Sequence, residues 1–374
     1  MRESLMMDAD TMVLPRLGDA AVEDPWGEDR PRRAADRSAT AALTRWRIAA
    51  WLVPAALMGA LGAARITTSG PTAGELATRL AATSPWPGIG AALTGDDTAL
   101  GPYHLLMRGW VALFGATDLA LRVPSLLAIV GAAALVGALA ARIATPAAGL
   151  SAGVIFTVLP TSIRYAQEAQ PYAPAVFAAV LATWLLVPAL DRPGPRRLVP
   201  YAGAVLLLGL CQPVALLLLA GHGWVVLAFR RRGVLRWLAA VAVGLLPVAA
   251  VLGYALRDGG QLASGAHPGA AVLAATPGDL FGVAALGGVL AGLALFSLPL
   301  RYAAAICTAW ALVPALALLA LAQAVPVWSA GNLLFTVPAW AVLGGVALSR
   351  ARAAGALAVL ALVALLAVAA QLPS

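Results

Sequence analysis

The sequence predicts an all-α membrane protein that crosses the bilayer many times. Of its 374 residues, 61% are hydrophobic and 11% are charged, and the mean hydropathy is +0.86. Soluble domains are only about half apolar. Apolar runs recur along most of the chain, and a helix needs about 20 apolar residues to cross the hydrocarbon. These observations exclude an ordinary soluble domain.

The N-terminal segment differs from the rest of the chain. Residues 1–47 are polar, carry charges of both signs and show no apolar period. Segments of this kind cannot bury enough apolar surface to fold by themselves. We therefore expect a disordered cytoplasmic tail at 1–47 and a transmembrane domain over 48–374.

The first span and the loop after it come next. Residues 48–64 form the first apolar run, and residues 67–118 form the expected first outer loop. Within this loop, 103–114 is apolar but short and carries His104 and Arg108. A short amphipathic segment suits the membrane surface, so we expect an interfacial helix there.

Ten further runs complete a bundle of about eleven spans. Each is close to spanning length. Their approximate bounds are 119–141, 147–160, 172–190, 198–211, 213–229, 237–256, 280–298, 302–322, 333–348 and 353–370.

The arginines indicate the orientation of this bundle. All 25 basic residues are arginines, and with eleven spans 19 of them fall on the side of the N-terminus and six on the other side. By the positive-inside rule the N-terminus is cytoplasmic. The net charge of +8 therefore reflects topology, and no nucleic-acid partner is expected. A chain rich in alanine and without lysine suggests a GC-rich bacterial genome, so we expect a bacterial plasma membrane.

Acidic residues gather on the opposite, extracytoplasmic side. Outside the tail only Asp191 faces the cytoplasm. The other acids are Glu75, Asp96, Asp97, Asp118, Glu168, Asp258 and Asp279. Ionisable groups crowded at a bilayer surface indicate function, although acids in a loop can also be merely solvated. Because nucleotide-activated donors are absent outside the cell and no P-loop or dinucleotide motif is present, an activated substrate would have to arrive attached to a lipid.

A second polar stretch, R-Y-A-Q-E-A-Q-P-Y-A-P, covers 164–174. Gln167, Glu168 and Tyr172 have the groups to bind sugar hydroxyls or to place a phosphate. A helix beginning near Pro171 would offer its N-terminal amides to an anion. The alternative is a polar turn whose aromatic rings belong to an interfacial belt.

Four motifs in order carry a resemblance to a known superfamily. The first is D-D followed by G-P-Y-H-L-L-M-R-G-W and L-F-G-A-T-D-L-A-L-R-V-P-S. The second is Y-A-Q-E-A-Q-P-Y-A, the third G-L-C-Q-P-V-A-L-L-L-L-A-G-H-G-W and the fourth W-S-A-G-N-L-L-F-T-V-P-A-W. Together they resemble the GT-C glycosyltransferases, the group of mannosyl- and arabinosyltransferases that use polyprenyl-phosphate sugars and includes the protein mannosyltransferases.

The motifs also depart from that group's pattern. Ala166 and Gln170 stand where a serine and an arginine are usual. His222 fits the third motif, but Cys211 and Gln212 replace a histidine and a tyrosine. In the fourth motif an asparagine, at position 332, occupies a place where an arginine is common.

The resemblance implies a site built from outward loops around a cavity. A loop aspartate would be the general base, because an acceptor hydroxyl must lose its proton as it attacks the sugar. Asp96 or Asp97 would take this role, and the other would orient the acceptor or help to bind a divalent cation. Arg122 and Arg164 would hold the departing phosphate, unless Arg122 is only a snorkelling anchor. His104 would donate a hydrogen bond to substrate or phosphate.

Two functions from different classes remain open. The first is an inverting transferase that moves a sugar, mannose or arabinose, from a polyprenyl-phosphate donor to a glycan, lipid or protein acceptor in the cell envelope. The second is a catalytically degenerate relative that acts as a transporter or assembly partner, since Gln170 and Asn332 remove two positive charges. Transporters tend to carry charges near mid-membrane, whereas here the charges lie at span ends.

Overall fold

The computed structural model describes residues 29–68, 70–84, 100–192, 194–257, 265–297 and 302–371. Within these ranges all regular elements are helices, and the β pairing is limited to one isolated bridge between Ala266 and Trp328. The chain divides into two compact units, Met1–Arg45 and Trp46–Ser374. The second unit contains the predicted bundle, which confirms the all-α class.

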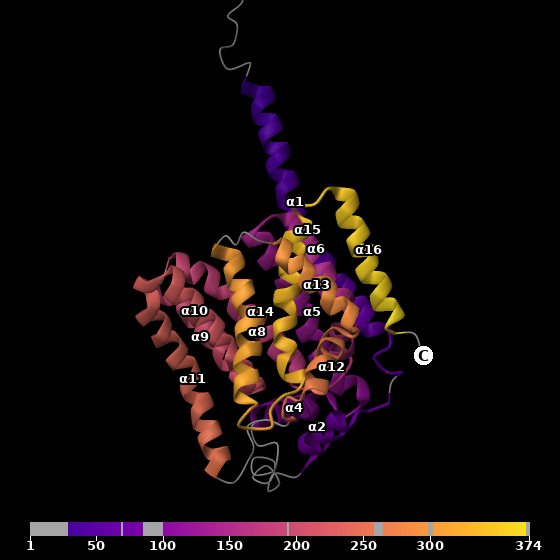
Figure 1. Cartoon of the computed structure of the whole chain (residues 1–374), viewed down its shortest axis with the longest axis vertical. Helices are drawn as coiled ribbons and strands as arrows, with labels where there is room; N and C mark the ends of the chain where they lie inside the picture. The colour runs from indigo at the N-terminus through magenta and orange to yellow at the C-terminus, as the bar shows by residue number, and fades with distance from the viewer. Residues whose placement is uncertain are drawn as a thin grey trace, which may run out of the picture. The chain divides into compact units, whose positions relative to one another are not determined.

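The helices follow one another with short connections (Figure 1). In chain order the elements are α1 (Asp29–Ala64), α2 (Ala73–Thr83), α4 (Gly101–Phe114), α5 (Asp118–Ile143), α6 (Pro146–Val158), α7 (Pro160–Ala166), α8 (Tyr172–Asp191), α9 (Pro195–Cys211), the 3-10 helix η2 (Pro213–Leu217), α10 (Leu218–Phe229), η3 (Arg231–Gly233), α11 (Val234–Arg257), α12 (Ala270–Phe281), α13 (Ala284–Phe296), α14 (Tyr302–Leu321), η4 (Gly331–Thr336), α15 (Val337–Leu348) and α16 (Ala353–Ala369).

The expected number of eleven spans is not confirmed. Among the described residues, five helices are long and apolar enough to cross a membrane, or up to seven if each bent pair counts as one span. Every expected run nevertheless lies on a helix or a helix pair. The α6–α7 pair bends by 68° and the α12–α13 pair by 82°. Pro160 starts α7, where a proline cannot continue the preceding ladder, and Gly282 has a φ of 94°, which suits glycine.

The expected disordered tail is partly helical. Helix α1 begins at Asp29, so residues 29–47 are helical, and residues 1–28 lie outside the described part of the chain. Two properties of the sequence explain the difference. The segment is rich in alanine and arginine, which are good helix formers, and extending an existing helix avoids the cost of nucleation. Low hydrophobicity therefore says little about local helicity.

Small residues let the central helices approach closely. A Cβ added at Gly137 of α5 would lie 1.8 Å from the carbonyl oxygen of Ala50. A Cβ at Gly345 of α15 would lie 2.5 Å from that of Ala148 in α6. Helices in lipid associate through such small residues, because hydrophobicity does not drive them together there. The abundance of alanine and glycine is therefore a packing requirement of this bundle.

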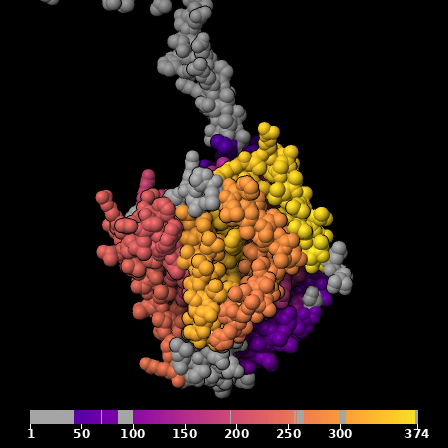
Figure 2. Space-filling view, viewed as in Figure 1, coloured from indigo at the N-terminus to yellow at the C-terminus, as the bar shows by residue number. Residues whose placement is uncertain are grey.

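The outer surface of the bundle is apolar. Large side chains that are more than 60% exposed include Leu235, Leu246, Phe296, Leu316 and Leu365. Figure 2 shows α13 and α14 on one face, with α16 along one edge and α10 and α11 along the other. Apolar surface of this extent on a monomer marks contact with lipid or a partner. Together with the long apolar helices, it identifies a multi-pass membrane protein.

The two ends of the bundle differ in their charged residues. Helices α2 and α4 lie at one end, near the start of α5, while the α8–α9, α10–α11 and α15–α16 connections lie at the other (Figure 1). The second end carries most arginines of the described bundle, among them Arg142, Arg197, Arg230 and Arg350. This separation agrees with the predicted alternation of spans. That the arginine-rich end faces the cytoplasm stays a prediction.

Candidate functional site

A buried carboxylate organises the end where α2 and α4 lie. Thr72 and Glu75 form a capping box at the start of α2, in which the Glu75 amide donates to Thr72 Oγ1 (3.4 Å) and the Thr72 amide donates to Glu75 Oε2 (2.9 Å). A T-x-x-E sequence favours this arrangement. Glu75 Oε1 also accepts a hydrogen bond from the amide of Ala169, at 3.1 Å. The carboxylate thus joins α2 to the connection between α7 and α8.

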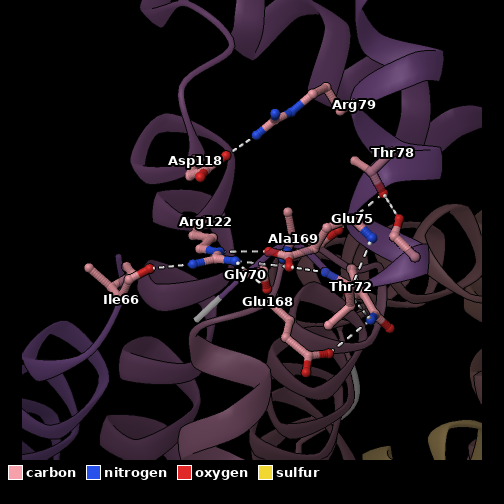
Figure 3. Close-up of polar contacts among 12 residues, drawn as sticks. Ile66, Gly70, Thr72, Glu75, Thr78, Arg79, Asp118, Arg122, Glu168 and Ala169 are labelled. Carbon is pink, nitrogen blue, oxygen red and sulfur yellow. Dashed lines mark hydrogen bonds and ion pairs between the residues drawn. The ribbon is translucent and has the colours of Figure 1, made fainter. Parts of the chain in front are cut away.

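Arg122 of α5 completes this cluster (Figure 3). Its Nε donates to Glu75 Oε1 at 2.7 Å and its Nη2 to Glu75 Oε2 at 3.0 Å. Its Nη1 donates to the carbonyl of Ile66 at 2.6 Å, and Nη2 reaches that of Gly70 at 3.4 Å. Arg122 is only 2% exposed. Protein groups therefore occupy the guanidinium in this structure, and a contact of Arg122 with the phosphate stays a prediction.

The environment of Glu75 favours its charged form. Burial raises the pKa of this carboxyl, but hydrogen bonds from Arg122, Thr72 and Ala169 and the charge of Arg122 outweigh burial. The pKa of Glu75 is therefore held below its ordinary value of 4.5. The cluster is ionised at neutral pH and acts as an electrostatic tie between α2 and α5.

The polar stretch 164–174 lies against the cluster of Glu75 and Arg122. Arg164 Nε donates to Glu168 Oε1 at 2.7 Å, one helical turn along the chain. Gln170 Nε2 donates to Glu168 Oε2 at 2.8 Å and to Thr72 Oγ1 at 3.4 Å. The side chain of Arg164 is 62% exposed and that of Glu168 only 10%. Arg164 is therefore open to a ligand, while Glu168 mainly orients it.

Other predicted ligands of this stretch have structural partners. Gln167 Nε2 donates to the carbonyls of Leu61 (3.3 Å) and Gly62 (3.1 Å), so it ties the end of α1 to α7. That Gln167 also binds substrate stays a prediction. Tyr172 meets Tyr165 edge to face, with ring centroids 5.4 Å apart. Tyr172 also approaches Gly331, where an added Cβ would lie 2.7 Å from its ring.

The first outer loop is described only in part. Asp96 and Asp97 lie outside the described residues, in the stretch that joins α2 to α4. Their predicted role as general base therefore stays a prediction. His104 lies in the first turn of α4, half-buried, with its ring 5.8 Å from that of Tyr103. Arg108 of the same helix donates to the carbonyl of Ser84, which follows α2.

The two departures from the expected arginine pattern have internal roles. Gln170 bridges Glu168 and Thr72, as described above. Asn332 of η4 donates from Nδ2 to the carbonyl of Val327 (2.8 Å), and its Oδ1 accepts a hydrogen bond from Gln212 Nε2 at 3.0 Å. Asn332 is buried and Gln170 is half-buried. Positions where an arginine is common in GT-C proteins thus serve packing of the polar interior here.

Glu75 was not among the predicted site residues, although it is central to the cluster. The T-x-x-E capping signal was present in the sequence, but nothing in the sequence paired Glu75 with an arginine 47 residues away. His222 lies far from this end of the bundle and is fully buried between Thr183 (3.1 Å) and Tyr201 (3.0 Å). Among the described residues, no three histidine, cysteine or acidic side chains are placed to hold a metal ion.

Comparison with known proteins agrees with this architecture. The model of the dolichyl-phosphate-mannose-protein mannosyltransferase family matches residues 102–254. The fold is similar to ArnT from Cupriavidus metallidurans in the apo state, with a TM-score of 0.54 and 17% identity over 91% of this chain and 66% of that one. For ArnT bound to undecaprenyl phosphate the TM-score is 0.56, at 15% identity over 84% and 61%.

This chain therefore spans less than two thirds of the length of the ArnT structures. No match was found among curated proteins. The bundle and its charged end define a multi-pass membrane protein with the fold of GT-C glycosyltransferases. The family match over 102–254 and this likeness in fold agree with the resemblance that the motifs carry.

Proposed function

We propose that the chain transfers a sugar from a polyprenyl-phosphate donor to an acceptor at the end of the bundle formed by α2, α4 and the α7–α8 connection. The observation that carries this proposal is the mannosyltransferase family match over 102–254. This range contains α4 except for its first residue, the start of α5 and the polar stretch around Arg164 and Glu168. The match thus covers Arg122, Arg164 and Glu168, whereas Glu75 and the two aspartates precede it.

The chemistry requires a base and a cation. The acceptor hydroxyl loses its proton as it attacks the anomeric carbon, and a carboxylate within hydrogen-bond reach takes it up. We assign this base to Asp96 or Asp97, with the other orienting the acceptor or assisting a divalent cation. Attack opposite the leaving phosphate inverts the anomeric centre. The sugar–phosphate bond breaks as the new glycosidic bond forms, and the phosphate leaves with the negative charge.

Arg164 is the best placed described residue to bind that phosphate. Its Nε contacts Glu168, which fixes the plane of the guanidinium, while 62% of its side chain is exposed. An arginine oriented in this way presents its remaining donors to a phosphate as a pair. His104, in the first turn of α4, is assigned a supporting hydrogen bond to substrate or phosphate, and Tyr172 a contact with the sugar.

The cluster of Glu75 and Arg122 has a different role in this proposal. It touches α2, α5, the residues before α2 and the α7–α8 connection. It holds these segments in one geometry, and preorganisation of this kind is worth a large share of catalysis. Arg122 and Glu75 are therefore positioning residues, which act through the segments that they join.

The finer assignment follows from the family and the sequence. We propose that the sugar is a hexose or pentose, with mannose or arabinose as the first candidates. We propose that the acceptor belongs to the cell envelope and is modified on the extracytoplasmic face of a bacterial plasma membrane. One solved structure similar in fold, ArnT from Cupriavidus metallidurans, is bound to undecaprenyl phosphate. That complex supports a lipid-linked donor for this chain.

Transfer of a labelled sugar tests the proposal. The full chain in proteoliposomes is supplied with polyprenyl-phosphate mannose or arabinose and with envelope fractions as acceptor. Asp96→Asn, Asp97→Asn and the double variant are compared with Asp118→Asn, a matched change at the same end whose carboxylate pairs with Arg79 on the surface. We expect transfer to fall at least about a hundredfold in one aspartate variant, as loss of a general base does. Full transfer by the double variant would contradict the proposal.

A non-catalytic membrane protein is the second candidate. Its support is that Gln170 and Asn332, two positions where GT-C proteins often carry arginine, are engaged in internal hydrogen bonds. The same proteoliposomes distinguish it. Movement of a lipid-linked or free substrate across the bilayer without formation of a glycosidic bond would favour the second candidate over the first.

A further inference from the structure

A basic cavity lies at the end of the bundle opposite to α2 and α4. It has a volume of about 650 Å³ and is formed where α8 ends, α9 begins and the chain turns from α10 through η3 into α11. Four arginines line it, and one acid accompanies them; these residues are Arg230, Arg231, Arg232, Arg236 and Asp191. Trp237 and Leu198 are among its apolar lining residues. The lining therefore carries a clear excess of positive charge.

The single acid does not cancel this excess. Asp191 accepts a contact from Arg230 Nη2 at 3.4 Å, so its charge is already directed toward one of the four arginines. Arg231 donates from Nε to the carbonyl of Leu227 at 3.0 Å, which holds its guanidinium beside the end of α10. With four arginines and one acid, the lining has an excess of positive charge at a cavity between helices, where it would attract an anion.

An apolar groove continues from this cavity along α9 and α11. It has a volume of about 770 Å³ and shares Leu198 and Arg236 with the basic cavity. Arg236 is its single charged residue, and small side chains make the space; they are Ala202, Gly203, Ala239, Ala240 and Gly244. Figure 1 shows α9 and α11 running side by side from the arginine-rich end.

The length of the groove matches one leaflet of a bilayer. On α9 the lining runs from Pro195 to Leu206. At 1.5 Å per residue this is about 17 Å. Half of the hydrocarbon core is about 15 Å. A groove of this length that begins at a cluster of arginines matches a phospholipid, which has a charged headgroup and an apolar chain of similar length.

We propose that this site binds an anionic phospholipid, with its phosphate headgroup in the arginine cavity and one acyl chain in the groove between α9 and α11. Basic cavities between helices at the positive side of membrane proteins attract anionic headgroups. A zwitterionic lipid with the same chains lacks the net negative charge that this arginine-rich lining would select. The inference does not rest on the proposed transfer reaction, because none of its residues belongs to the end that holds Glu75 and Arg164.

Native mass spectrometry of the delipidated full chain tests the proposal. Phosphatidylglycerol and phosphatidylcholine with identical acyl chains are titrated in turn. We expect phosphatidylglycerol to be retained at least about tenfold more strongly. The double variant Arg231→Gln, Arg232→Gln is expected to lose about tenfold or more of this affinity. Arg192→Gln combined with Arg352→Gln is the matched control, since both are exposed arginines of the same end outside the cavity lining.

A second pair of variants tests the groove without changing charge. Gly203 is an exposed helical residue whose added Cβ meets nothing within 4 Å, so Gly203→Leu fills the groove while the helix is kept. Gly288→Leu is its control, because Gly288 of α13 is equally open and lies outside the groove. We expect Gly203→Leu alone to weaken retention of phosphatidylglycerol.

Three results would overturn the proposal. The first is equal retention of the two lipids by the unmodified chain. The second is unchanged retention in the arginine double variant or in Gly203→Leu, relative to their controls. The third is displacement of phosphatidylglycerol by free glycerol phosphate at similar concentration, which would show a site for a soluble anion with no use for the groove.

Discussion

Glu75 of α2 and Arg122 of α5 are joined by two parallel hydrogen bonds, Nε to Oε1 at 2.7 Å and Nη2 to Oε2 at 3.0 Å. Their side chains are only 5% and 3% exposed. A buried ion pair loses much of its attraction to desolvation, so its presence by itself is weak evidence of stability. Removing one partner is different, because the other charge is then left buried. The first two predictions follow from this asymmetry.

Replacing Glu75 by glutamine should destabilise the fold strongly. Glu75→Gln leaves the charge of Arg122 uncompensated, and breaking a buried pair in this way costs about 3 to 5 kcal/mol. The loss of stability is measured by unfolding the detergent-solubilised chain with heat or with denaturant. Asp118→Asn is the control, since its pair with Arg79 is 46% and 34% exposed and should contribute about 1 kcal/mol or less. Equal losses in both variants would contradict the assignment.

The stability of the fold should also depend on pH through the ionisation of Glu75. The folded-state pKa of Glu75 lies below its ordinary value of 4.5. The unfolded chain therefore takes up the proton first, so the stabilisation is fully present above pH 4.5 and is lost as the pH falls through the folded-state pKa. Midpoints of thermal unfolding at a series of pH values from neutral downward measure it. The slope below pH 4.5 should be shallower in Glu75→Gln, and an identical slope in both proteins would argue against this carboxyl.

The buried hydrogen bonds around His222 should matter for stability and leave transfer intact. Tyr201 OH accepts a hydrogen bond from Trp237 Nε1 at 3.0 Å and contacts His222 Nδ1 at 3.0 Å. Tyr201→Phe leaves these two groups without their partner, which costs about 1 to 3 kcal/mol. We expect a lower unfolding midpoint and unchanged transfer per folded molecule. Loss of transfer at an unchanged midpoint would mean that this interior network serves the reaction.

Replacement by alanine should destabilise the fold at a closely packed glycine and not at an open one. In Gly137→Ala the added Cβ would lie 1.8 Å from the carbonyl oxygen of Ala50, so α1 and α5 must move apart. Shifts of this kind cost about 1 to 3 kcal/mol. Gly109→Ala in α4 meets nothing within 4 Å and should stabilise by about 0.5 to 1 kcal/mol through helix propensity. The unfolding midpoints of the two variants, measured side by side, test this prediction. A similar shift in both would refute close packing at Gly137.

Much of the fold could be predicted from local sequence. The apolar runs place the helices of the bundle, because a helix that faces lipid must be apolar over its whole length. The bend before α7 and the break at Gly282 were not predicted as such. Both arise where a proline or a glycine interrupts an apolar run, and hydropathy does not register a change of direction. The helical start of α1 was missed for a related reason, since polarity and helix propensity are separate properties.

The candidate site was predicted in its location more than in its contacts. Arg164 and Glu168 were expected on the same side as the first outer loop, and the structure places them against the start of α2. Gln167 and Arg122 were expected to bind a ligand, and the structure shows hydrogen bonds from both to backbone carbonyls of the protein, which were not predicted. A polar side chain near a loop has many possible partners. Which one it meets depends on where distant segments of the chain come to lie.

The sequence by itself determined the class of protein, the positions of the apolar helices and the two chemically different ends, because composition and periodicity act locally along the chain. Only the tertiary structure decided that Glu75 pairs with Arg122, that Gln170 and Asn332 make hydrogen bonds within the protein, and that four arginines line one cavity beside an apolar groove. Each of these depends on the approach of segments tens of residues apart, and close helix packing through small residues brings those segments together.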